Sequence, residues 1–380
     1  MVQKGLWICT RREKVDLSAE KTKQIRESGV ELLRILAMMG VVLLHYNNAT
    51  MGQALVLANE GSINQNIVYF VENICICGVC IYVMISGYFM CTSRTRKISK
   101  VFELFLQVIL FKIIFYIVNI SRGLDVFSAK GLFLNALPNN YYVVLYSVLY
   151  IISPYINIVL LKLTKKQFEK LVISLVSIFL VWNFAIDYMQ NSAGIDSFGL
   201  SSVGMTGSQG GYTIVNFIVI YIIGAYIRLH RNERYDNKKV FLLAIIILFA
   251  MFGLSLYEHR SGYASVITWN YSNPLLVLLS ACWFIIFKNI RLKSRIINEL
   301  AKGSFTCFLI HGYFISYLKV YEYVNAEVWK LLIHMLISAA GLYLVAYIVY
   351  KIYSLCISPI VRLFGKILDR IDISVAVNND

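Results

Sequence analysis

Residues 30–46 read VELLRILAMMGVVLLHY, a stretch long and apolar enough to cross a membrane as a helix. Three ionisable residues interrupt it, namely Glu31, Arg34 and His45. Eleven positions separate Arg34 from His45, so the two side chains leave the same helical face, roughly 16 Å apart along the axis. Glu31 lies one turn before Arg34 on that face. Inserting each such side chain at membrane depth costs about 2.5–3.5 kcal/mol of free energy on insertion scales. This stripe of three ionisable residues therefore indicates a structural or functional role.

The rest of the chain repeats this apolar character. Of its 380 residues, 58% are hydrophobic and only 15% are charged, which is unlike a soluble domain. We therefore predict an all-α, polytopic integral membrane protein of about ten transmembrane helices, with lipid as the solvent for most of it. The expected spans are 29–46, 66–90, 99–120, 141–161, 168–186, 212–229, 240–257, 268–287, 303–319 and 329–354.

The distribution of basic residues predicts that both termini are cytoplasmic. With the basic segment 1–28 inside, 29 of the 36 Lys and Arg fall on the cytoplasmic side, five fall outside and two lie within spans. Topology therefore explains the positive charge, and no nucleic-acid partner is needed. Segment 1–28 lacks the apolar stretch of a secretory signal, so we expect the first helix to be retained. The predicted divisions are this segment, a transmembrane domain over 29–354 and a cytoplasmic tail over 355–380.

Cysteines and glycines offer weaker signals. Cys75, Cys77 and Cys80 point to different faces of a helix, so packing of small residues is favoured over a metal site, and we expect no metal. The external loop 187–211 is rich in glycine and has no Lys or Arg. It is either a mobile loop that binds the acceptor or a plain flexible connector, and it lacks the pattern of a nucleotide-binding loop.

Each buried polar residue has a structural alternative to a functional role. Glu31 and Arg34 can form a simple ion pair near the interface, and a lone histidine is usually a hydrogen-bonded core residue. His45 remains attractive because a neutral imidazole acts as a general base near neutral pH.

Two further segments carry polar or small residues at membrane depth. Gly87, which follows Ser86 near the end of the second span, lets a backbone or a thin ligand approach closely, although helix packing explains this pair equally well. His311 lies near the middle of the ninth span. Bundle stabilisation is the favoured interpretation for three other buried ionisable residues, Lys112, Glu72 and His334.

Three separated motifs resemble the acyltransferase 3 family of integral membrane acyltransferases. The first helix resembles the family's Asp/Glu-x-x-Arg start with its Arg-x10-His pattern, here Glu31, Arg34 and His45. Residues 83–88 (VMISGY) resemble its Phe-x-x-Ser-Gly-Phe/Tyr motif, with Val83 in place of the aromatic residue. Residues 304–311 (SFTCFLIH) resemble its late Tyr-Leu-Ile-His element, with Phe308 where the family often has Tyr. Looser echoes start at Tyr141, where the family typically has Trp, and at Tyr221.

The resemblance implies transfer of an acyl group, usually acetyl from cytoplasmic acetyl-CoA, to a hydroxyl of a surface polysaccharide or its lipid-linked precursor. It implies a location in the cytoplasmic membrane of a bacterium and no permanently bound cofactor, and it leaves a homo-oligomer open. The catalytic residues would be His45, Arg34 and Glu31, with His45 removing the acceptor proton or relaying the acetyl group. The substrate-binding residues would be Ser86, Gly87, Tyr88, Tyr142 and His311. The residues that bind acetyl-CoA would be Arg34, Arg94 and Arg96.

Two other functions fit a chain of this kind. A transporter or flippase of lipid-linked sugars would also have ten or more spans and buried charges, but it leaves the Arg34–His45 stripe without a particular task. A membrane polysaccharide polymerase would usually offer a large external loop, and the longest one expected here is about 25 residues. The sequence identifies neither the acceptor sugar nor the acyl chain length, and it does not separate covalent from direct transfer.

Overall fold

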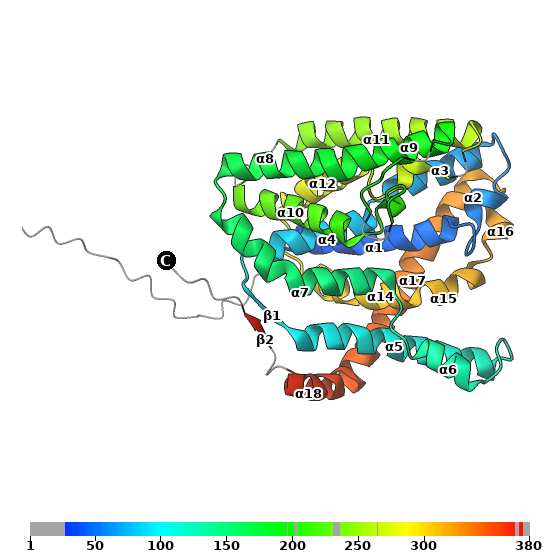
Figure 1. The fold of residues 1–380 in the computed structure, drawn as a ribbon. Coiled ribbons are helices and arrows are strands. Elements are labelled where there is room, and N and C mark those ends of the chain that lie inside the picture. Colours follow the sequence, from blue (N-terminus) through cyan, green and yellow to red (C-terminus); the bar gives the residue numbers. More distant parts are fainter. Residues whose placement is uncertain are drawn as a thin grey trace, which may run out of the picture.

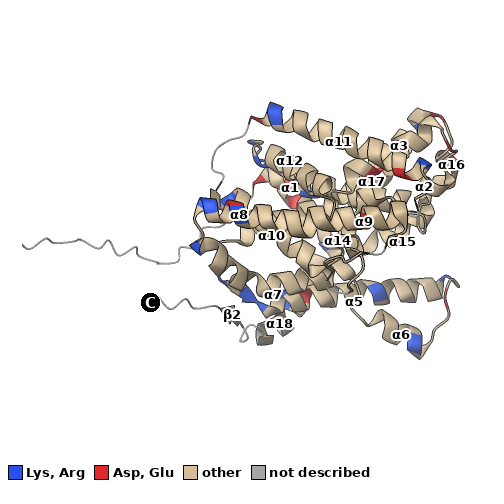
Figure 2. Ribbon diagram, turned by 45° about the horizontal axis from the view of Figure 1, so that its top comes forward, with Lys and Arg blue, Asp and Glu red and all other residues tan. Residues whose placement is uncertain are grey.

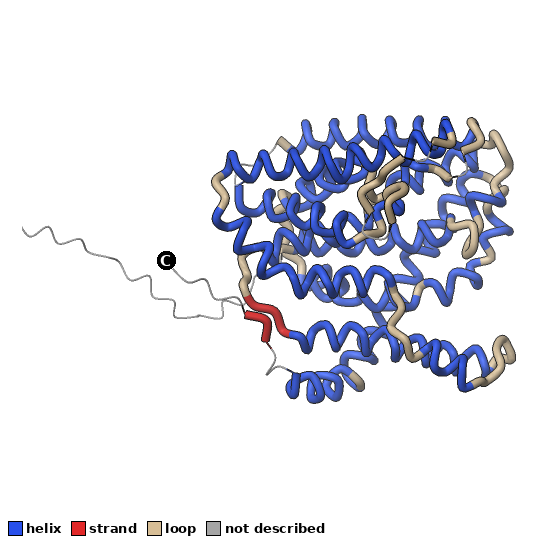
Figure 3. The backbone as a smooth tube through the Cα atoms, viewed as in Figure 1, coloured by secondary structure: helices blue, strands red, loops and turns tan. Residues whose placement is uncertain are grey.

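The structure is a bundle of helices of the kind that crosses a membrane (Figures 1 and 3). The computed structural model describes residues 27–195, 197–201, 204–230, 236–263, 265–368 and 372–374. Within these ranges, seven helical segments are long and apolar enough to span a bilayer: Ser28–Asn47, Ile63–Met90, Ile98–Ser121, Tyr141–Lys162, Lys165–Ala193, Asn237–Arg260 and Val328–Cys356. The chain is therefore a mostly helical, polytopic membrane protein, as predicted.

The elements follow in order along the chain. The first half comprises α1 (Ser28–Asn47), α2 (Ala54–Leu57), α3 (Ile63–Cys75), α4 (Gly78–Met90), β1 (Thr95–Lys97), α5 (Ile98–Ser121), α6 (Ala129–Asn135), α7 (Tyr141–Lys162), α8 (Lys165–Val176) and α9 (Asn183–Ala193). The second half comprises α10 (Ile214–His230), α11 (Asn237–Arg260), α12 (Pro274–Lys288), α13 (Arg295–Leu300), α14 (Ser304–Ile310), α15 (Gly312–Ile315), α16 (Val320–Tyr323), α17 (Val328–Cys356), α18 (Ser358–Leu368) and β2 (Asp372–Ser374).

The remaining three of the ten expected spans are shorter or interrupted. Helices α10 and α12 are apolar but fall below 18 residues. The span expected over 303–319 is divided into α14, α15 and a 3₁₀ turn over Ser316–Leu318. The division falls at His311, where the Phe314 N–H donates to the His311 carbonyl three residues back and tightens the helix. The predicted segment 1–28 lies outside the described residues except for Glu27 and Ser28.

Helix α1 occupies the centre of the bundle, where it contacts α3, α4, α12, α14 and α17. Of its most apolar stretch, 61% is buried inside the protein, against 28% for the peripheral helix α5. Contacts with these five helices place the ionisable residues of α1 in the bundle interior, where a partner can compensate their desolvation.

The two ends of the bundle differ in charge. We call the end that holds Ser28, Lys97 and Lys162 the basic end, and the end that holds Asn47, Ser121 and Tyr141 the opposite end. Figure 2 shows the denser group of Lys and Arg where α8 and α11 begin, at the basic end. The short antiparallel pair β1–β2 also lies there, with Arg96 opposite Ile373. This asymmetry matches the charge pattern along the sequence.

Helices α4 and α10 approach each other through two glycines. A Cβ atom on Gly87 would lie 2.1 Å from the Tyr221 carbonyl oxygen, and one on Gly224 would lie 2.2 Å from the Met84 carbonyl oxygen. The two backbones therefore touch at both positions, in the manner of small-residue contacts between membrane helices. Of the two uses predicted for Gly87, the close approach is that of another backbone.

This contact predicts that Gly87→Ala destabilises the protein by about 1–3 kcal/mol, because the added methyl group meets backbone that has to shift. The effect is measured by heating the purified protein and recording the fraction that stays monodisperse at each temperature. Gly253→Ala in α11 is the matched control, since a Cβ there meets nothing within 4 Å. Equal melting temperatures for the two variants would contradict the packing described.

Candidate functional site

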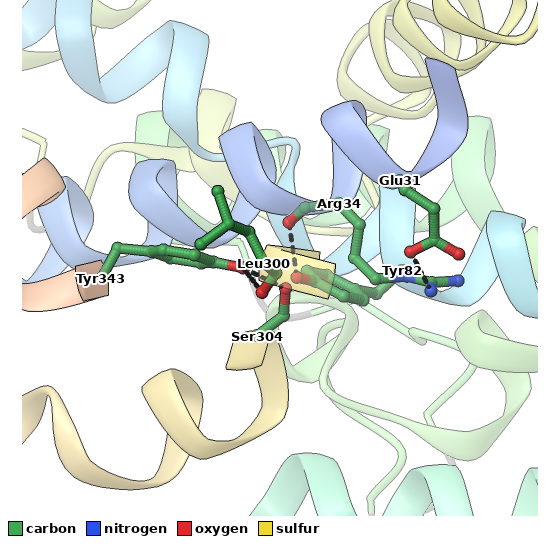
Figure 4. Close-up of polar contacts among 6 residues, drawn as sticks. All are labelled: Glu31, Arg34, Tyr82, Leu300, Ser304 and Tyr343. Carbon is green, nitrogen blue, oxygen red and sulfur yellow. Dashed lines mark hydrogen bonds and ion pairs between the residues drawn. The ribbon is translucent and has the colours of Figure 1, made fainter. Parts of the chain in front are cut away.

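The polar stripe of α1 begins with an ion pair. Arg34 Nη1 donates to Glu31 Oε2 at 2.8 Å, across one helical turn. Glu31 is almost completely enclosed, with 9% of its side chain exposed, whereas Arg34 keeps 27%. The Tyr82 hydroxyl of α4 donates to the Arg34 carbonyl oxygen at 2.7 Å and fixes this turn of α1 (Figure 4). The carboxylate therefore orients a guanidinium that is still partly accessible.

Next to this pair, a second group of polar side chains ties α14 to its neighbours (Figure 4). The Tyr343 hydroxyl of α17 donates to the Leu300 carbonyl oxygen at 3.0 Å. Since that uses its only proton, the Ser304 hydroxyl is the donor in the 2.9 Å contact with Tyr343. These bonds hold the start of α14 beside Arg34 and Tyr82.

A cavity of about 330 Å³ lies next to Arg34. Arg34, Ser86 and Tyr142, which the sequence predicted as site residues, line it together. Lys302 is a further basic lining residue. We call this space the Arg34 cavity.

The charge near Lys302 is positive. Hydrogen bonds from Lys302 and Lys351 hold the pKa of Glu299 below its ordinary value, so this carboxylate is ionised. One carboxylate therefore serves two lysines at 2.6 Å each, which leaves one positive charge beyond the Arg34–Glu31 ion pair. Such a surplus suits an anionic ligand.

The two predicted histidines meet deeper in the bundle. His311 Nε2, directly after α14, lies 2.7 Å from His45 Nδ1 of α1, and the ring centroids are 4.6 Å apart. His45 Nδ1 also lies 3.0 Å from the Val41 carbonyl oxygen, and His311 Nδ1 lies 2.8 Å from the Cys307 carbonyl oxygen. The two helices thus bring together residues that are 266 positions apart in sequence.

These contacts determine where the protons of the histidine pair are. A carbonyl oxygen only accepts, so both Nδ1 atoms carry hydrogen. In the neutral pair, His311 Nε2 is then the acceptor of the His45 Nδ1–H. Among the described residues His45 Nε2 has no hydrogen-bond partner and keeps its lone pair, whereas both nitrogens of His311 are engaged within the protein. The basic atom of the pair is therefore His45 Nε2.

A second cavity, of about 480 Å³, is lined by both histidines; we call it the His45 cavity. Its other lining residues include Glu72 and three tyrosines from the opposite end of the bundle, Tyr141, Tyr212 and Tyr271. The Arg34 and His45 cavities share three apolar lining residues, Val41, Val79 and Phe308. These three side chains form a partition between a space with basic residues and a space with a histidine base.

The remaining predicted residues lie outside both cavities. Tyr88 contacts the basic residues at the end of α10 and α12: Arg228 Nη1 donates to its hydroxyl at 3.1 Å, and Lys288 Nζ lies 5.8 Å from its ring centre. Arg96 is buried and donates to Ser153 Oγ at 2.9 Å and to two backbone carbonyl groups, so it anchors the loop after α4. Arg94 on the same loop is exposed.

The three residues expected to stabilise the bundle have different environments. Lys112 Nζ donates to the carbonyl oxygens of Leu134 and Leu137 and holds the segment after α6. His334 stacks on Tyr323 with ring centroids 3.8 Å apart. Glu72, in contrast, lines the His45 cavity. Sequence reasoning did not assign Glu72 or the three tyrosines to a site, because they come from separate helices and only packing brings them together.

No arrangement for a metal is present among the described residues: no three His, Cys, Asp or Glu side chains are placed to hold one. Cys75, Cys77 and Cys80 are buried.

Comparison with known proteins gives one match. A protein-family model described as an acyltransferase domain, of the acyltransferase 3 type, matches residues 27–351. No curated protein and no solved structure matches the chain. The matched region contains both histidines, the ion pair of α1 and every residue that lines the two cavities.

Proposed function

Since the chain belongs to the acyltransferase 3 family of membrane acyltransferases, we propose that it transfers an acetyl group from cytoplasmic acetyl-CoA to a sugar hydroxyl. The acceptor is a surface polysaccharide or its lipid-linked precursor. One observation carries the proposal: a histidine with a free Nε2 lone pair lines a cavity that shares a wall with a second, positively charged cavity.

The proposed topology has ten membrane crossings in a bacterial cytoplasmic membrane, with both termini in the cytoplasm. The excess of Lys and Arg at the basic end supports it. In this orientation Arg34 lies nearer the cytoplasmic end of α1, on the side where acetyl-CoA is available. His45 lies nearer the external end, on the side where surface sugars are assembled. The proposed divisions are 1–28, 29–354 and 355–380.

The Arg34 cavity is the proposed donor site. Acetyl-CoA carries several phosphate charges, and a guanidinium held by Glu31 presents planar donors that match phosphate or carbonyl oxygens. Lys302 adds a positive charge in the same cavity, and exposed Arg94 offers another at the basic end. Arg96 contributes by anchoring the loop that carries Arg94.

His45 is the proposed general base. Its Nε2 removes the proton of the acceptor hydroxyl, and the hydroxyl oxygen attacks the carbonyl carbon of the acetyl thioester. The carbon–sulfur bond then breaks, and CoA leaves as a thiolate that takes the proton from the imidazolium. His311 accepts the His45 Nδ1–H at 2.7 Å, so it keeps the ring in the useful tautomer and stabilises its positive charge. This makes His311 a positioning residue.

The apolar partition is the proposed passage for the acetyl thioester. Val41, Val79 and Phe308 line both cavities, so only a thin group can bridge them. Hydrocarbon walls also keep water away from the thioester and so prevent its hydrolysis. The proposed passage requires side-chain movements at these three residues that let an acetyl group reach His45.

We expect Val79→Trp to lower acetyl transfer by about a hundredfold or more, because a filled partition misplaces the thioester. The measurement is the initial rate of acetyl transfer. Val79→Ala, which makes this side chain smaller, is measured for comparison. Acetyl-CoA binding to Val79→Trp, measured by equilibrium dialysis, reports whether the Arg34 cavity is intact. Full transfer activity in a folded Val79→Trp protein would contradict the passage.

The function itself is tested by incubating membranes that contain the protein with radiolabelled acetyl-CoA. The expected result is label in the host's surface polysaccharide or lipid-linked sugar fraction, absent from membranes without the protein. Label in no sugar fraction, with protein that is folded and monodisperse, would favour the transporter of lipid-linked sugars instead.

A further inference from the structure

We propose that the His45 cavity contains a carbohydrate subsite for an uncharged sugar ring, formed by Tyr141, Tyr212, Tyr271 and the side chain of Glu72. Its role as the acceptor subsite rests on the proposed function. Binding of the sugar itself requires neither acetyl-CoA nor catalysis, so the two can be tested apart.

The tyrosines form a continuous aromatic wall. The ring centroids of Tyr141 and Tyr212 are 5.1 Å apart at 65°, and those of Tyr212 and Tyr271 are 4.9 Å apart at 61°. Tyr271 is buried at 4% exposure, whereas Tyr141 and Tyr212 are 41% and 49% exposed while lining the cavity. Sugar rings present faces of C–H groups, which pack well against the faces of aromatic rings. The two exposed rings therefore offer the surface that such a ring would cover.

The wall is held in place by the glycine-rich loop before α10. The Tyr271 N–H donates to the Gly210 carbonyl oxygen at 2.8 Å. Asn216 Nδ2 donates to the carbonyl oxygens of Gly211 and Tyr271 at 3.0 and 3.1 Å. Gly211 has a φ of +78°, and a Cβ there would lie 2.5 Å from the Ser272 nitrogen. The glycines thus let the residue before Tyr212 pack against the backbone that carries Tyr271, which preorganises both rings.

Glu72 places in the cavity a polar side chain that can form a further hydrogen bond. The residue is 7% exposed and lines the cavity. Its Oε2 accepts a hydrogen bond from Asn47 Nδ2 at 2.8 Å, and its Oε1 has no hydrogen-bond partner among the described residues. An oxygen without a partner in the protein can accept a hydrogen bond from a ligand in the cavity. Vicinal sugar hydroxyls are donors of the kind that would satisfy it.

The charge of the cavity selects the class of sugar. Among the described residues that line it, none is Lys or Arg, and Glu72 is the one acidic residue. An acidic sugar, such as a uronate, would place its negative charge in this enclosed space with no cation to balance it. The volume of about 480 Å³ is that of a small-molecule site and suits one sugar ring with part of its neighbour.

Saturation-transfer NMR on the full-length protein tests this subsite. The protein is held in phospholipid nanodiscs, because detergents with sugar headgroups would compete for the site. The probes are methyl glycosides of neutral hexoses, 6-deoxyhexoses and N-acetylhexosamines, compared with the methyl glycosides of the corresponding uronates. The expected result is binding of at least one neutral probe, at least tenfold tighter than its uronate counterpart.

Tyr212→Ala and Glu72→Gln should each weaken that binding about tenfold. Tyr321→Ala, which removes a tyrosine that is 64% exposed and lies outside the cavity, should leave it unchanged. The absence of binding by every neutral probe, preference for a uronate, or unchanged binding in Tyr212→Ala would each overturn the subsite. Binding as expected in a protein that transfers no acetyl group would keep the subsite and reject the proposed function.

Discussion

His45→Ala is expected to lower acetyl transfer by about 10²–10⁴-fold, the range that a positioned general base contributes. The variant removes the one nitrogen of the histidine pair that has a free lone pair in the neutral state. The acceptor hydroxyl then keeps its proton and attacks the thioester poorly. The measurement is the initial rate of label transfer from acetyl-CoA with purified protein.

The matched control is His259→Ala. His259 lies at the end of α11, where its Nε2 contacts Gln65 Nε2 at 3.2 Å, and it lines neither cavity. It should transfer acetyl at the rate of the unchanged protein. Sugar binding by the His45→Ala protein, measured by NMR, shows whether its cavity is intact. Transfer by folded His45→Ala within threefold of the unchanged protein would contradict the role of His45.

Arg34→Ala is expected to raise the KM for acetyl-CoA by about 10- to 100-fold, since charge-assisted hydrogen bonds to an anionic ligand contribute about 1.5–3 kcal/mol. Loss of the guanidinium also leaves the enclosed Glu31 carboxylate without its 2.8 Å partner, so some loss of stability is expected as well. Steady-state kinetics against acetyl-CoA concentration, together with the melting temperature, separates the two effects.

Arg34→Lys keeps the charge beside Glu31 and loses the planar pair of donors, so it should fold normally and still show a raised KM. Arg122→Ala is the matched control, because Arg122 is exposed at the opposite end and contacts Tyr317. An unchanged KM for acetyl-CoA in both Arg34 variants would remove Arg34 from the donor site.

The sequence alone predicted the membrane class and the central importance of the first helix. Helical periodicity placed Arg34 and His45 on one face of α1, and the structure adds that they line different cavities. The difference arises at Val41, one turn before His45. The Val41 side chain lies in the partition, and the Val41 carbonyl oxygen contacts His45 Nδ1. Helical periodicity predicts the direction of a side chain. The boundary between the two cavities, however, is formed by side chains of other helices, Val79 of α4 and Phe308 of α14.

Contacts between distant segments could not be predicted in this way. The histidine pair depends on the packing of α14 against α1, and the tyrosine wall depends on three helix starts that meet at the opposite end. Gly87 and Tyr88 show the converse. Their motif marked the family, yet Gly87 contacts the backbone of α10 and Tyr88 contacts Arg228, so both shape the bundle around the cavities.

The most direct test of acetyl transfer through this single chain uses sealed vesicles that contain the purified protein. Radiolabelled acetyl-CoA is supplied outside, and the host's surface polysaccharide is trapped inside. The account predicts labelled polysaccharide in the lumen with the unchanged protein and none with His45→Ala, while acetyl-CoA itself stays outside. Folded protein that leaves the trapped polysaccharide unlabelled, or equal labelling by both proteins, would contradict it.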